Sequence, residues 1–389
     1  MKGKVRVAIL GYYPPEETTK NLGGAHIHVF DLTEQLRKYE DLDVHVITNS
    51  NKIKKDRTIK KDNLTIHYLS SPKLPRLITS LSIDQYKLIK KIKEVNPDIV
   101  HAQGTAPMTG FTTTLLRTKY PVLLTVHGIV QEEAKTWQGP IGLLKGIIYG
   151  LMEKYTLHRI KNIIVVSPYV KEKIKPLCKD SKIQVIPVGI NEDFFNVPDN
   201  EKENRLLFVG GIEPRKGLLH LLNAVKLIRG TIHNIDLHIV GRIRKKRYFN
   251  TLSKYIRDNN LDDNVKFLGF LTNEEVKREY SECSIFVLPS KEESLGLVLV
   301  EVMATEKPIV ASKIGGIPYV VDNNETGFLV NYGNSEQLAE KIILLLKDED
   351  LRRKMGVKGK KKAKEFRNEE IAKRIYEIYG VVISNEKGK

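Results

Sequence analysis

The sequence is poor in cysteine, in tryptophan and in long apolar runs. Its 389 residues include only two cysteines, Cys178 and Cys283, and one tryptophan, Trp137. Two thiols form neither a disulfide framework nor a four-ligand zinc site, and they fit a reducing, cytoplasmic compartment. No apolar run reaches the roughly 20 residues that a bilayer-spanning helix needs. These shortages argue against a disulfide-stapled secreted domain and against a transmembrane protein.

Acidic side chains are also in short supply. The chain has 47 Asp and Glu against 64 Lys and Arg, a net charge of +17. Residues 1–190 hold 30 basic and 17 acidic side chains, a net of +13, and residues 191–389 hold 34 and 30, a net of +4. A basic first half suits an acidic partner such as anionic lipid headgroups, a phosphorylated substrate or a nucleic acid. A solvated, lysine-rich surface explains the same charge without a partner.

Short apolar runs alternate with amphipathic stretches along nearly the whole chain. Buried strands are predicted at Val5–Leu10, Asp43–Thr48, Leu64–Leu69, Ile99–Ala102, Val122–Val126, Ile163–Val166 and Ile183–Ile186, and then at Leu206–Val209, Leu237–Val240, Val265–Leu268, Ile285–Leu288, Pro308–Ala311 and Phe328–Val330. Helical patterns lie between most of them, for example at Ala25–Tyr39, Leu81–Val95, Leu218–Ile228 and Ser335–Leu346. The alternation predicts an α/β fold of two doubly wound, Rossmann-like domains in series.

The boundary between these domains is predicted near residue 190, before the polar stretch Asp193–Asn204. The domains are then 1–190 and 191–366, followed by a C-terminal helix and tail at 367–389. Whether that helix returns to pack on the first domain is left open by the sequence. Two such domains facing a central cleft would bring the carboxyl ends of both sheets to it, where ligands of open α/β sheets bind.

The stretch from Glu292 to Glu301 is the most informative. Glu293 is expected in the loop after the strand Ile285–Leu288. Glu301 lies eight residues further on, so both carboxylates are expected on roughly the same side of one helix. That helix is otherwise apolar, and a carboxylate such as Glu301 is costly to bury there without a partner. Ribose hydroxyls are suitable donors. The amides of Leu295–Leu297, at the start of the helix, would be available to a phosphate.

Glycine turns mark the ends of two other strands. The turn Gly210–Gly217 ends in Arg215 and Lys216, which suits a diphosphate through backbone donors and two cations. Gly23-Gly24 precedes the first predicted helix, where backbone amides can approach an anion closely. Solvated turns explain both patterns equally simply.

Two histidines end predicted strands. His127, in the run Thr125–Gly128, is followed by glycine, which leaves the backbone beside it accessible to a ligand. His101 follows another apolar run. For each, a ligand-facing role and a hydrogen-bonded structural role stay open. No metal site is expected, because the acidic turns Asp41–Asp43 and Asp348–Asp350 are predicted at the surface.

Taken in order, these motifs resemble those of the family-4 retaining glycosyltransferases, which have the two-domain GT-B fold. The resemblance extends over nearly the whole chain. Glu293 and Glu301 match the E-x7-E signature, His127 the T-x-H-G histidine, Gly23-Gly24 the N-terminal glycine loop, Arg215–Gly217 the end of the diphosphate-binding segment, and Ala304–Pro318 the run that ends in Gly-Gly-x-Pro. Five motifs in this order are far more specific than any one of them.

The chain also departs from the family pattern at several positions. Gly211 stands where the family often has arginine, so Lys216, helped by Arg215, would carry more of the charge. Gln103 stands where many members have a second histidine. Glu306 replaces a usual glycine, Tyr319 a frequent glutamate, and Pro187–Asn191 a P-N-G-V-D run. No core catalytic group is lost, but the subfamily and its acceptor stay open.

The resemblance implies transfer of a hexosyl or N-acetylhexosaminyl group from a nucleotide diphosphate sugar, UDP- or GDP-linked rather than ADP-linked. The acceptor would be a hydroxyl of a glycan, a lipid-linked sugar or a small molecule, the anomeric configuration would be retained, and neither a metal nor a further cofactor would be needed. His127, Glu293 and Lys216 are the expected catalytic residues. The expected substrate-binding residues are Gly23, Gly24, Arg215, Ser294, Leu295, Gly296, Leu297 and Glu301, and the strand-end position of His101 adds that residue.

The acceptor is expected on the first domain, which holds the basic excess and the Trp137 loop, Gln131–Pro140. The apolar and basic stretch Ile141–Lys161 would suit the cytoplasmic face of an anionic membrane through Ile147, Ile148, Leu151 and Met152. A core helix with snorkelling lysines explains the same stretch.

Other classes of function are alternatives. A nucleotide-sugar epimerase of the same fold would need no acceptor. A catalytically silent sugar-binding relative would not need the catalytic groups that this chain keeps. A nucleic-acid-binding protein would interleave basic and aromatic side chains on one surface, whereas the lysines here are dispersed, so no nucleic acid partner is expected.

Overall fold

The computed structural model describes residues 4–14, 25–74, 76–130, 132 and 139–387, and the chain divides into two compact units. Unit 1 comprises Met1–Gly189 and Asn368–Lys389, and unit 2 comprises Ile190–Arg367. The sequence placed these changes after residues 190 and 366. The C-terminal helix belongs to unit 1, one of the placements that the sequence left open.

Unit 1 is built on an eight-stranded sheet with the order β3-β4-β2-β1-β5-β6-β7-β8. Its strands are β1 (Val5–Leu10), β2 (Leu42–Ser50), β3 (Arg57–Lys61), β4 (Leu64–Ser70), β5 (Ile99–Gln103), β6 (Val122–Val126), β7 (Asn162–Val165) and β8 (Lys182–Val185). All pairs are parallel except β3 with β4. The central strands are buried on both faces, which is why they read as continuous apolar runs.

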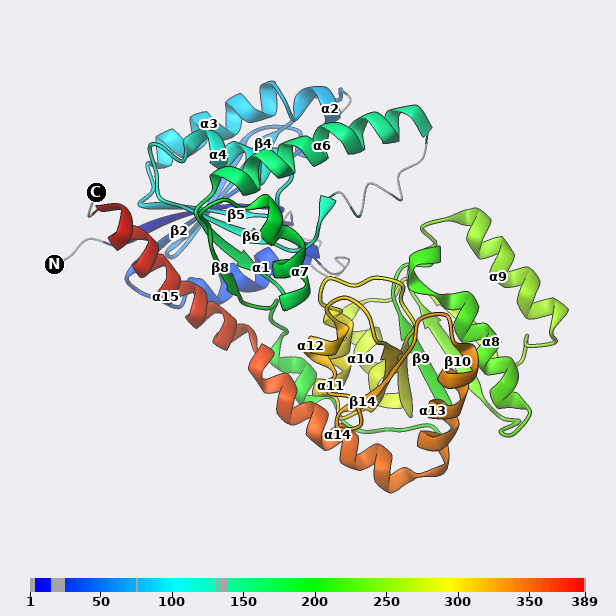
Figure 1. Ribbon diagram of the computed structural model, residues 1–389. Coiled ribbons are helices and arrows are strands. Elements are labelled where there is room, and N and C mark those ends of the chain that lie inside the picture. The colour runs from blue at the N-terminus through cyan, green and yellow to red at the C-terminus, as the bar shows by residue number, and fades with distance from the viewer. Residues whose placement is uncertain (1–3, 15–24, 75, 131, 133–138, 388–389) are drawn as a thin grey trace. The chain divides into compact units, whose positions relative to one another are not determined.

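Helices cover both faces of this sheet (Figure 1). They are α1 (Ala25–Leu36), α2 (Arg76–Thr79), α3 (Ile83–Val95), α4 (Thr112–Leu116), α6 (Gly139–Arg159), α7 (Pro168–Ile174) and α15 (Asn368–Lys387). α3, α4 and α6 lie on one face, and α1 and α15 lie on the other. The apolar face of α15, with Ile371, Ile375, Ile378 and Val382, is buried in the core, so the last helix completes unit 1.

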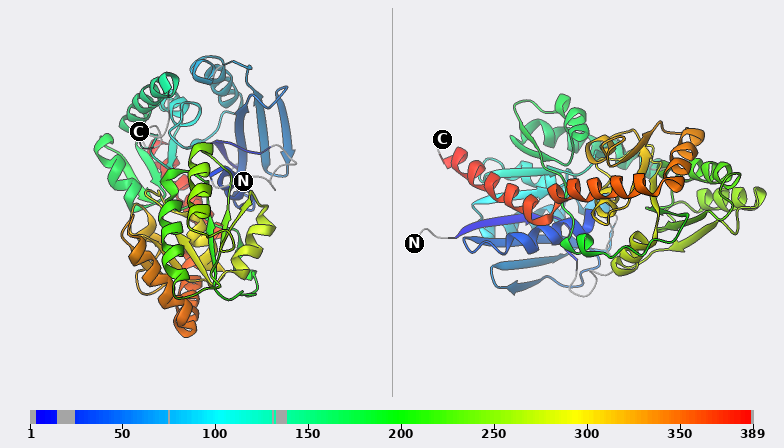
Figure 2. Two further views of the ribbon diagram at one scale, coloured as in Figure 1. Left: turned by 90° about the vertical axis from the view of Figure 1, so that its right-hand side faces the viewer. Right: turned by 90° about the horizontal axis from the view of Figure 1, so that it is seen from below.

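Unit 2 has a six-stranded parallel sheet with the order β11-β10-β9-β12-β13-β14. Its strands are β9 (Arg205–Val209), β10 (Asp236–Val240), β11 (Val265–Gly269), β12 (Ile285–Leu288), β13 (Ile309–Ser312) and β14 (Gly327–Val330). Its helices are α8 (Leu218–Arg229), α9 (Lys246–Asp258), α10 (Asn273–Glu282), α11 (Leu297–Ala304), α12 (Ile317–Val320), α13 (Ser335–Lys347) and α14 (Glu349–Ala363). Both units are therefore doubly wound α/β folds, as the sequence predicts; Figure 2 shows further views.

The strand order places a switch point in each sheet. In unit 1 the chain moves outward from β1 and later resumes on its other side at β5. In unit 2 the same change occurs between β9 and β12. Loops after such strand pairs diverge to opposite faces and leave a crevice at the carboxyl edge, where ligands of these folds bind.

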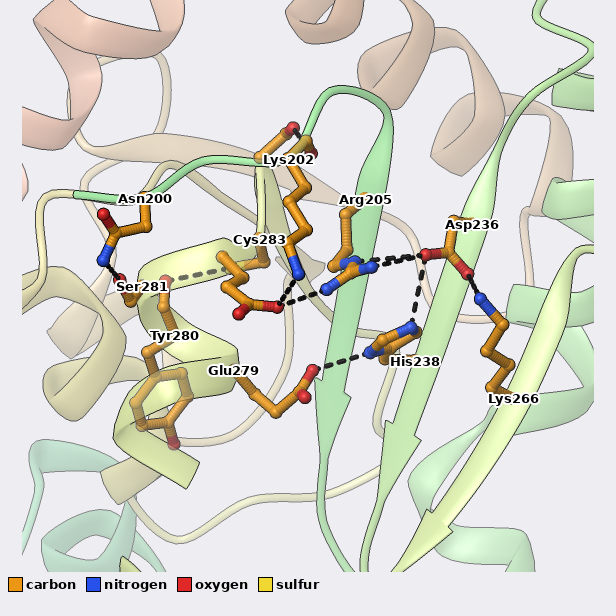
Figure 3. Close-up of polar contacts among 12 residues, drawn as sticks. Asn200, Lys202, Arg205, Asp236, His238, Lys266, Glu279, Tyr280, Ser281 and Cys283 are labelled. Atoms are coloured by element: carbon orange, nitrogen blue, oxygen red, sulfur yellow. Dashed lines mark hydrogen bonds and ion pairs between the residues drawn. The ribbon is translucent and has the colours of Figure 1, made fainter. Parts of the chain in front are cut away.

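The amino ends of the unit 2 strands are held by ion pairs (Figure 3). Arg205, the first residue of β9, contacts Asp236 of β10 at 3.0 Å and Glu282 of α10 at 2.5 Å. His238 lies 2.7 Å from Glu279 of α10. These contacts tie α10 to the sheet at the edge opposite the switch-point loops, so they belong to the scaffold.

One strand escaped the sequence analysis. β3 is an exposed edge strand of the pattern R-T-I-K-K and is the only antiparallel member among the described strands of its sheet. It has one half-buried apolar residue, Ile59, so it lacks the apolar run that identifies the parallel strands. Its pairing partner, rather than its composition, makes it a strand.

Glu306 occupies a strained turn directly after α11. It follows the C-cap Thr305 and has φ of 61°, the left-handed conformation in which helices usually end with glycine. The usual glycine of the family at this position therefore has a conformational cause. Glu306 keeps a surface ion pair of 2.9 Å with Lys360.

We predict that Glu306→Gly raises the free energy of unfolding by about 0.5–1 kcal/mol, because relief of the left-handed strain exceeds the loss of one exposed ion pair. Urea denaturation followed by circular dichroism measures this change. Glu306→Ala is the control, because it removes the carboxylate and keeps the strain. A glycine variant no more stable than the alanine variant would contradict the prediction.

Candidate functional site

In unit 1, a chain of hydrogen bonds ends at His127. This residue directly follows β6, next to the end of β5. Its Nε2 lies 2.8 Å from Oε1 of Gln103, the last residue of β5. The Gln103 amide nitrogen lies 3.1 Å from Nε2 of His101. His101 in turn reaches the hydroxyls of Thr125 and Tyr379, each at 2.8 Å.

The directions of these bonds assign the tautomer of each ring. Because the amide oxygen of Gln103 can only accept, Nε2 of His127 carries the hydrogen and Nδ1 is its unprotonated nitrogen. The Gln103 amide donates to Nε2 of His101, so His101 carries its hydrogen on Nδ1 and donates it to Tyr379. Gln103, which the sequence analysis noted only as a departure, therefore orients His127.

Both rings are neutral at physiological pH. Burial lowers the pKa of His127 to about 4. Burial, together with the nearby His127, lowers the pKa of His101 to about 3. His28 of α1 packs edge-on against His127, with ring centroids 4.7 Å apart, and burial lowers its pKa well below the usual range. No carboxylate within this group compensates a positive charge, so the site favours uncharged imidazoles.

The two predicted histidines have different positions. His127 is half-buried at the carboxyl edge, where its second nitrogen can meet a ligand. His101 is fully buried, and both of its nitrogens are engaged within the protein. The structure thus places His101 as a support beneath Gln103, and it does not present the substrate-facing nitrogen that the sequence analysis expected.

A buried carboxylate supports the loops on either side of His127. Glu153 of α6 has no exposed surface and accepts hydrogen bonds from the Thr105 hydroxyl at 2.8 Å and from the Val130 amide at 3.0 Å. It thereby ties the loop after β5 to the loop after β6. A glutamate within an amphipathic helix gives no sequence signal for this role, because both partners come from elsewhere in the chain.

In unit 2, an ion pair joins the two loops of the switch point. Lys216, after β9, lies 2.5 Å from Oε1 of Glu293, after β12. Ser290 donates to the same oxygen at 2.9 Å, and Arg215 lies 3.8 Å from Oε2. Arg215 also contacts Glu213 at 3.1 Å. The structure thus brings together three predicted residues, Arg215, Lys216 and Glu293, and adds Ser290.

Two glycines let these loops approach each other. Gly217 has φ of +69°, and a Cβ there would lie 1.9 Å from the carbonyl oxygen of Pro289. Gly315 has φ of +54°, and its Cβ would lie 2.2 Å from the carbonyl oxygen of Glu293. The next amide, that of Gly316, donates to the same carbonyl at 2.8 Å. The Gly-Gly-x-Pro motif therefore holds the backbone of Glu293 in place.

The two glutamates have opposite electrostatic environments. Burial alone would raise the pKa of Glu293, but the adjacent Lys216 and Arg215 outweigh it and hold the pKa below its usual range. Burial raises the pKa of Glu301, against a hydrogen bond from the Tyr280 hydroxyl at 2.7 Å. Glu301 makes no other hydrogen bond within the described residues. One carboxylate is thus held as an anion, and the other keeps an oxygen for a further donor.

Glu293 lies in the loop after β12, as the sequence predicts. The expectation that it shares one helix with Glu301 is wrong, because α11 begins at Leu297 and only Glu301 lies on it. Gly296 has φ of +86° and turns the chain into the helix. Ser294 and Leu295 bend ahead of it, and Leu297 is the first helical residue, so the predicted phosphate-facing amides lie at this N-terminus.

Three residues that the sequence singled out lie outside the described residues. They are Gly23, Gly24 and Trp137. Within the part of the chain that is described, no three His, Cys, Asp or Glu side chains gather as metal ligands do. Tyr280, Ser290 and Glu153 were missed, because a partner from a distant segment defines each role.

Two protein families match the chain, and their matches meet close to the boundary between unit 1 and unit 2. Residues 189–362 match the family described as "Glycosyl transferases group 1", and residues 22–194 match "Glycosyltransferase Family 4". An uncharacterized glycosyltransferase of Methanocaldococcus jannaschii is 32% identical over 373 residues, which cover 95% of each chain.

Solved structures resemble the chain over nearly its full length. Sucrose-phosphate synthase from Thermosynechococcus elongatus has a TM-score of 0.82 at 23% identity and covers 98% of this chain and 100% of its own. Anabaena HepE, solved with UDP and glucose, has a TM-score of 0.74 at 17% identity and covers 97% and 99%. At these identities the likeness establishes the fold.

The Lys216–Glu293 pair predicts a distinctive pattern of stability. Lys216→Met leaves a nearly buried carboxylate without its closest cation and should lower the free energy of unfolding by about 2–3 kcal/mol at pH 7. The added substitution Glu293→Gln should recover most of that loss. Urea denaturation of the two single variants and the double variant measures the coupling.

The pH dependence of the unfolding free energy provides the control for these three variants. The low pKa of Glu293 contributes stability above the ordinary glutamate range, and that contribution disappears as pH falls through the lowered value. The deficit of Lys216→Met should therefore shrink at acid pH. Additive effects at pH 7, or a deficit independent of pH, would contradict the predicted coupling.

Proposed function

The chain belongs to the glycosyltransferases of family 4 and has their GT-B fold, and from this membership we propose that it is a retaining hexosyl- or N-acetylhexosaminyltransferase. It moves the sugar of a nucleotide diphosphate donor to a hydroxyl of a glycan, glycolipid or lipid-linked acceptor, and it uses no metal ion. The observation that carries this proposal is the cluster of Lys216, Arg215 and Glu293 at the switch point of unit 2.

Stabilisation of the departing diphosphate is the main catalytic task in the proposed reaction. As the bond from the anomeric carbon to the phosphate oxygen breaks, negative charge grows on the diphosphate and positive charge on the sugar. Lys216 and Arg215 supply cations, and the amides of Leu295–Leu297 supply backbone donors. Gly23-Gly24 supplies further amides by resemblance. An oxygen of the departing diphosphate acts as the base and takes the proton of the acceptor hydroxyl.

A neutral His127 suits the sugar side of this reaction. Its Nε2 hydrogen is committed to Gln103, so Nδ1 offers a lone pair to a sugar hydroxyl. Because burial keeps its pKa at about 4, the ring adds no positive charge beside a cationic, oxocarbenium-like transition state. We assign it the role of contacting the transferred sugar, through the ring and its own backbone carbonyl.

The two glutamates take separate parts of the donor. Oε1 of Glu293 already accepts hydrogen bonds from Lys216 and Ser290, so Oε2 is the oxygen that accepts hydrogen bonds from the sugar hydroxyls. One oxygen of Glu301 is held by Tyr280, and the other accepts from the ribose hydroxyls. UDP is the preferred nucleotide and GDP the next. Support for this order comes from HepE, a protein of the same fold that was solved with UDP.

We assign the acceptor side to unit 1 and to an anionic membrane surface. An outward face of α6 and the neighbouring α2–α3 segment expose large apolar side chains. The members are Ile78, Leu81, Tyr86, Leu143, Leu144, Ile147, Leu151 and Tyr155, called here the apolar surface. Of the four side chains that the sequence proposed, Ile147 and Leu151 are exposed, Ile148 is half-buried and Met152 is buried.

Positive charge accompanies the apolar surface. Lys154 and Arg159 are exposed on α6, and Lys145 lies over the Tyr149 ring at 5.2 Å. Basic side chains around an apolar helix face are typical of interfacial binding to anionic lipid. No helix in the described ranges is long and apolar enough to cross a bilayer. The two free cysteines fit a location on the cytoplasmic face.

The donor site predicts a ranked set of variants. Glu301→Ala should weaken nucleotide-sugar binding about tenfold and more than Glu293→Ala does, because it loses charge-assisted bonds to the ribose. His127→Ala should lower turnover about 100-fold and change donor affinity little. Calorimetric titration and release of nucleoside diphosphate from UDP- and GDP-sugars measure both effects. Glu340→Ala, exposed on α13, is the control, and full activity of His127→Ala would sink the assignment.

The apolar surface predicts charge-dependent membrane binding. The wild-type protein should co-sediment with phosphatidylglycerol vesicles and only weakly with phosphatidylcholine vesicles. Leu143→Ser with Leu151→Ser should reduce binding about tenfold, because two exposed apolar anchors are lost. Leu227→Ser changes an exposed leucine of unit 2, away from the apolar surface, and should have no effect. Equal binding to both vesicle types would argue against the electrostatic part.

A further inference from the structure

Two consecutive glycines follow β9, and each has a basic side chain nearby. A Cβ on Gly210 would lie 3.0 Å from Cζ of Phe208 and 3.6 Å from Cε of Lys216. A Cβ on Gly211 would lie 3.0 Å from Cγ and 3.5 Å from Nε of Arg244. Lys216 and Arg244 therefore flank the same two-residue turn at the carboxyl end of β9.

The position of Arg244 is fixed by backbone hydrogen bonds. Arg244 lies in the loop between β10 and α9, and its amide donates to the carbonyl of Ile212 at 3.1 Å. The Ile212 amide donates to the carbonyl of Arg242 at 2.9 Å, and Ile212 and Ile243 form a parallel bridge. The loops after β9 and β10 thus run side by side as one backbone unit.

The cations of the diphosphate motif are already matched by carboxylates. Lys216 pairs with Glu293, and Arg215 pairs with Glu213 and lies near Glu293. Two positive charges thus face two negative ones. A nucleoside diphosphate adds negative charge to this place, so a further cation beside Lys216 and Arg215 would strengthen its binding.

Arg244 is a cation of this kind. Its side chain is exposed, and it forms no ion pair within the described residues. The segment Arg242–Arg247 contains five basic side chains and no acidic one. Arg242 is placed over the ring of Phe270 at 4.0 Å, whereas the stem of Arg244 lies on Gly211.

We propose that Arg244 binds the diphosphate of the nucleotide donor and supplies the positive charge that Arg215 and Lys216 do not. This inference rests on the proposed function and adds a binding residue from a third loop. A guanidinium can contact phosphate oxygens through two parallel N–H donors. Because a Cβ at position 211 would lie only 3.0 Å from Cγ of Arg244, glycine at that position gives the stem of Arg244 room.

Binding of UDP and GDP, compared with uridine and guanosine, tests the proposal by calorimetric titration. Arg244→Gln should weaken diphosphate binding at least about tenfold and leave nucleoside binding unchanged, because a charge-assisted contact is lost. The control is Arg257→Gln at the far end of α9, roughly 16 Å along the helix from its first residue and beyond the reach of a screened charge. It should stay within about twofold of wild type.

A relocated arginine gives a second, independent test. The three atoms nearest to a Cβ on Gly211 all belong to Arg244. Arg244→Ala frees that space, so the combination of Gly211→Arg with Arg244→Ala should restore much of the lost affinity. Gly211→Arg alone, with Arg244 in place, should crowd the two side chains and bind the diphosphate no more tightly than wild type.

The outcomes distinguish a failure of the role of Arg244 from a failure of the proposed function. Unchanged diphosphate affinity in Arg244→Gln, in a protein whose wild type binds UDP or GDP, overturns the role of Arg244 and leaves the proposed function standing. Equal losses for nucleotide and nucleoside also overturn it, since the defect then does not lie at the phosphates. A wild type that binds no nucleoside diphosphate overturns both proposals.

Discussion

In unit 2, an ion pair between a nearly buried carboxylate and a lysine joins the two loops of the switch point. Glu293 follows β12, Lys216 follows β9, and their contact at 2.5 Å crosses the place where the strand order reverses. Around this pair the backbone has little freedom, because Gly217 and Gly315 admit neighbouring carbonyls where any side chain would collide. Ser290 and Arg215 both lie beside Glu293, and α11 begins four residues after it. The chemistry proposed for unit 2 depends on this local arrangement.

Unit 1 follows the opposite electrostatic rule. Its candidate residues are uncharged, and His127, Gln103 and His101 form a line of neutral hydrogen bonds that ends on Tyr379 of the last helix. Burial without a compensating carboxylate keeps the imidazoles neutral. The return of α15 to unit 1 therefore does more than fill its core, since it also supplies the final hydroxyl of this line. Unit 2 thus holds a group of fixed charges, and unit 1 holds a group of neutral dipoles.

The exposed surfaces of the two units also differ from each other. Unit 1 exposes the apolar surface of α2, α3 and α6 with basic residues beside it. Unit 2 concentrates exposed basic residues in Arg242–Arg247, next to the glycine turn after β9. The overall net charge of +17 conceals this difference, because it sums dispersed lysines with the two local groups.

The sequence by itself determined the α/β class, nearly every parallel strand and the residues of the main motifs, because buried parallel strands must be continuously apolar and switch-point loops must carry glycine and polar groups. It also identified His127, Lys216 and Glu293. Only the tertiary structure separated His127 from His101, which have similar sequence contexts but different burial. It alone paired Glu301 with Tyr280 and set Arg244 on Gly211. Each of these relations joins segments that are distant in sequence or depends on local backbone geometry, and no periodicity or spacing along the chain encodes such a contact.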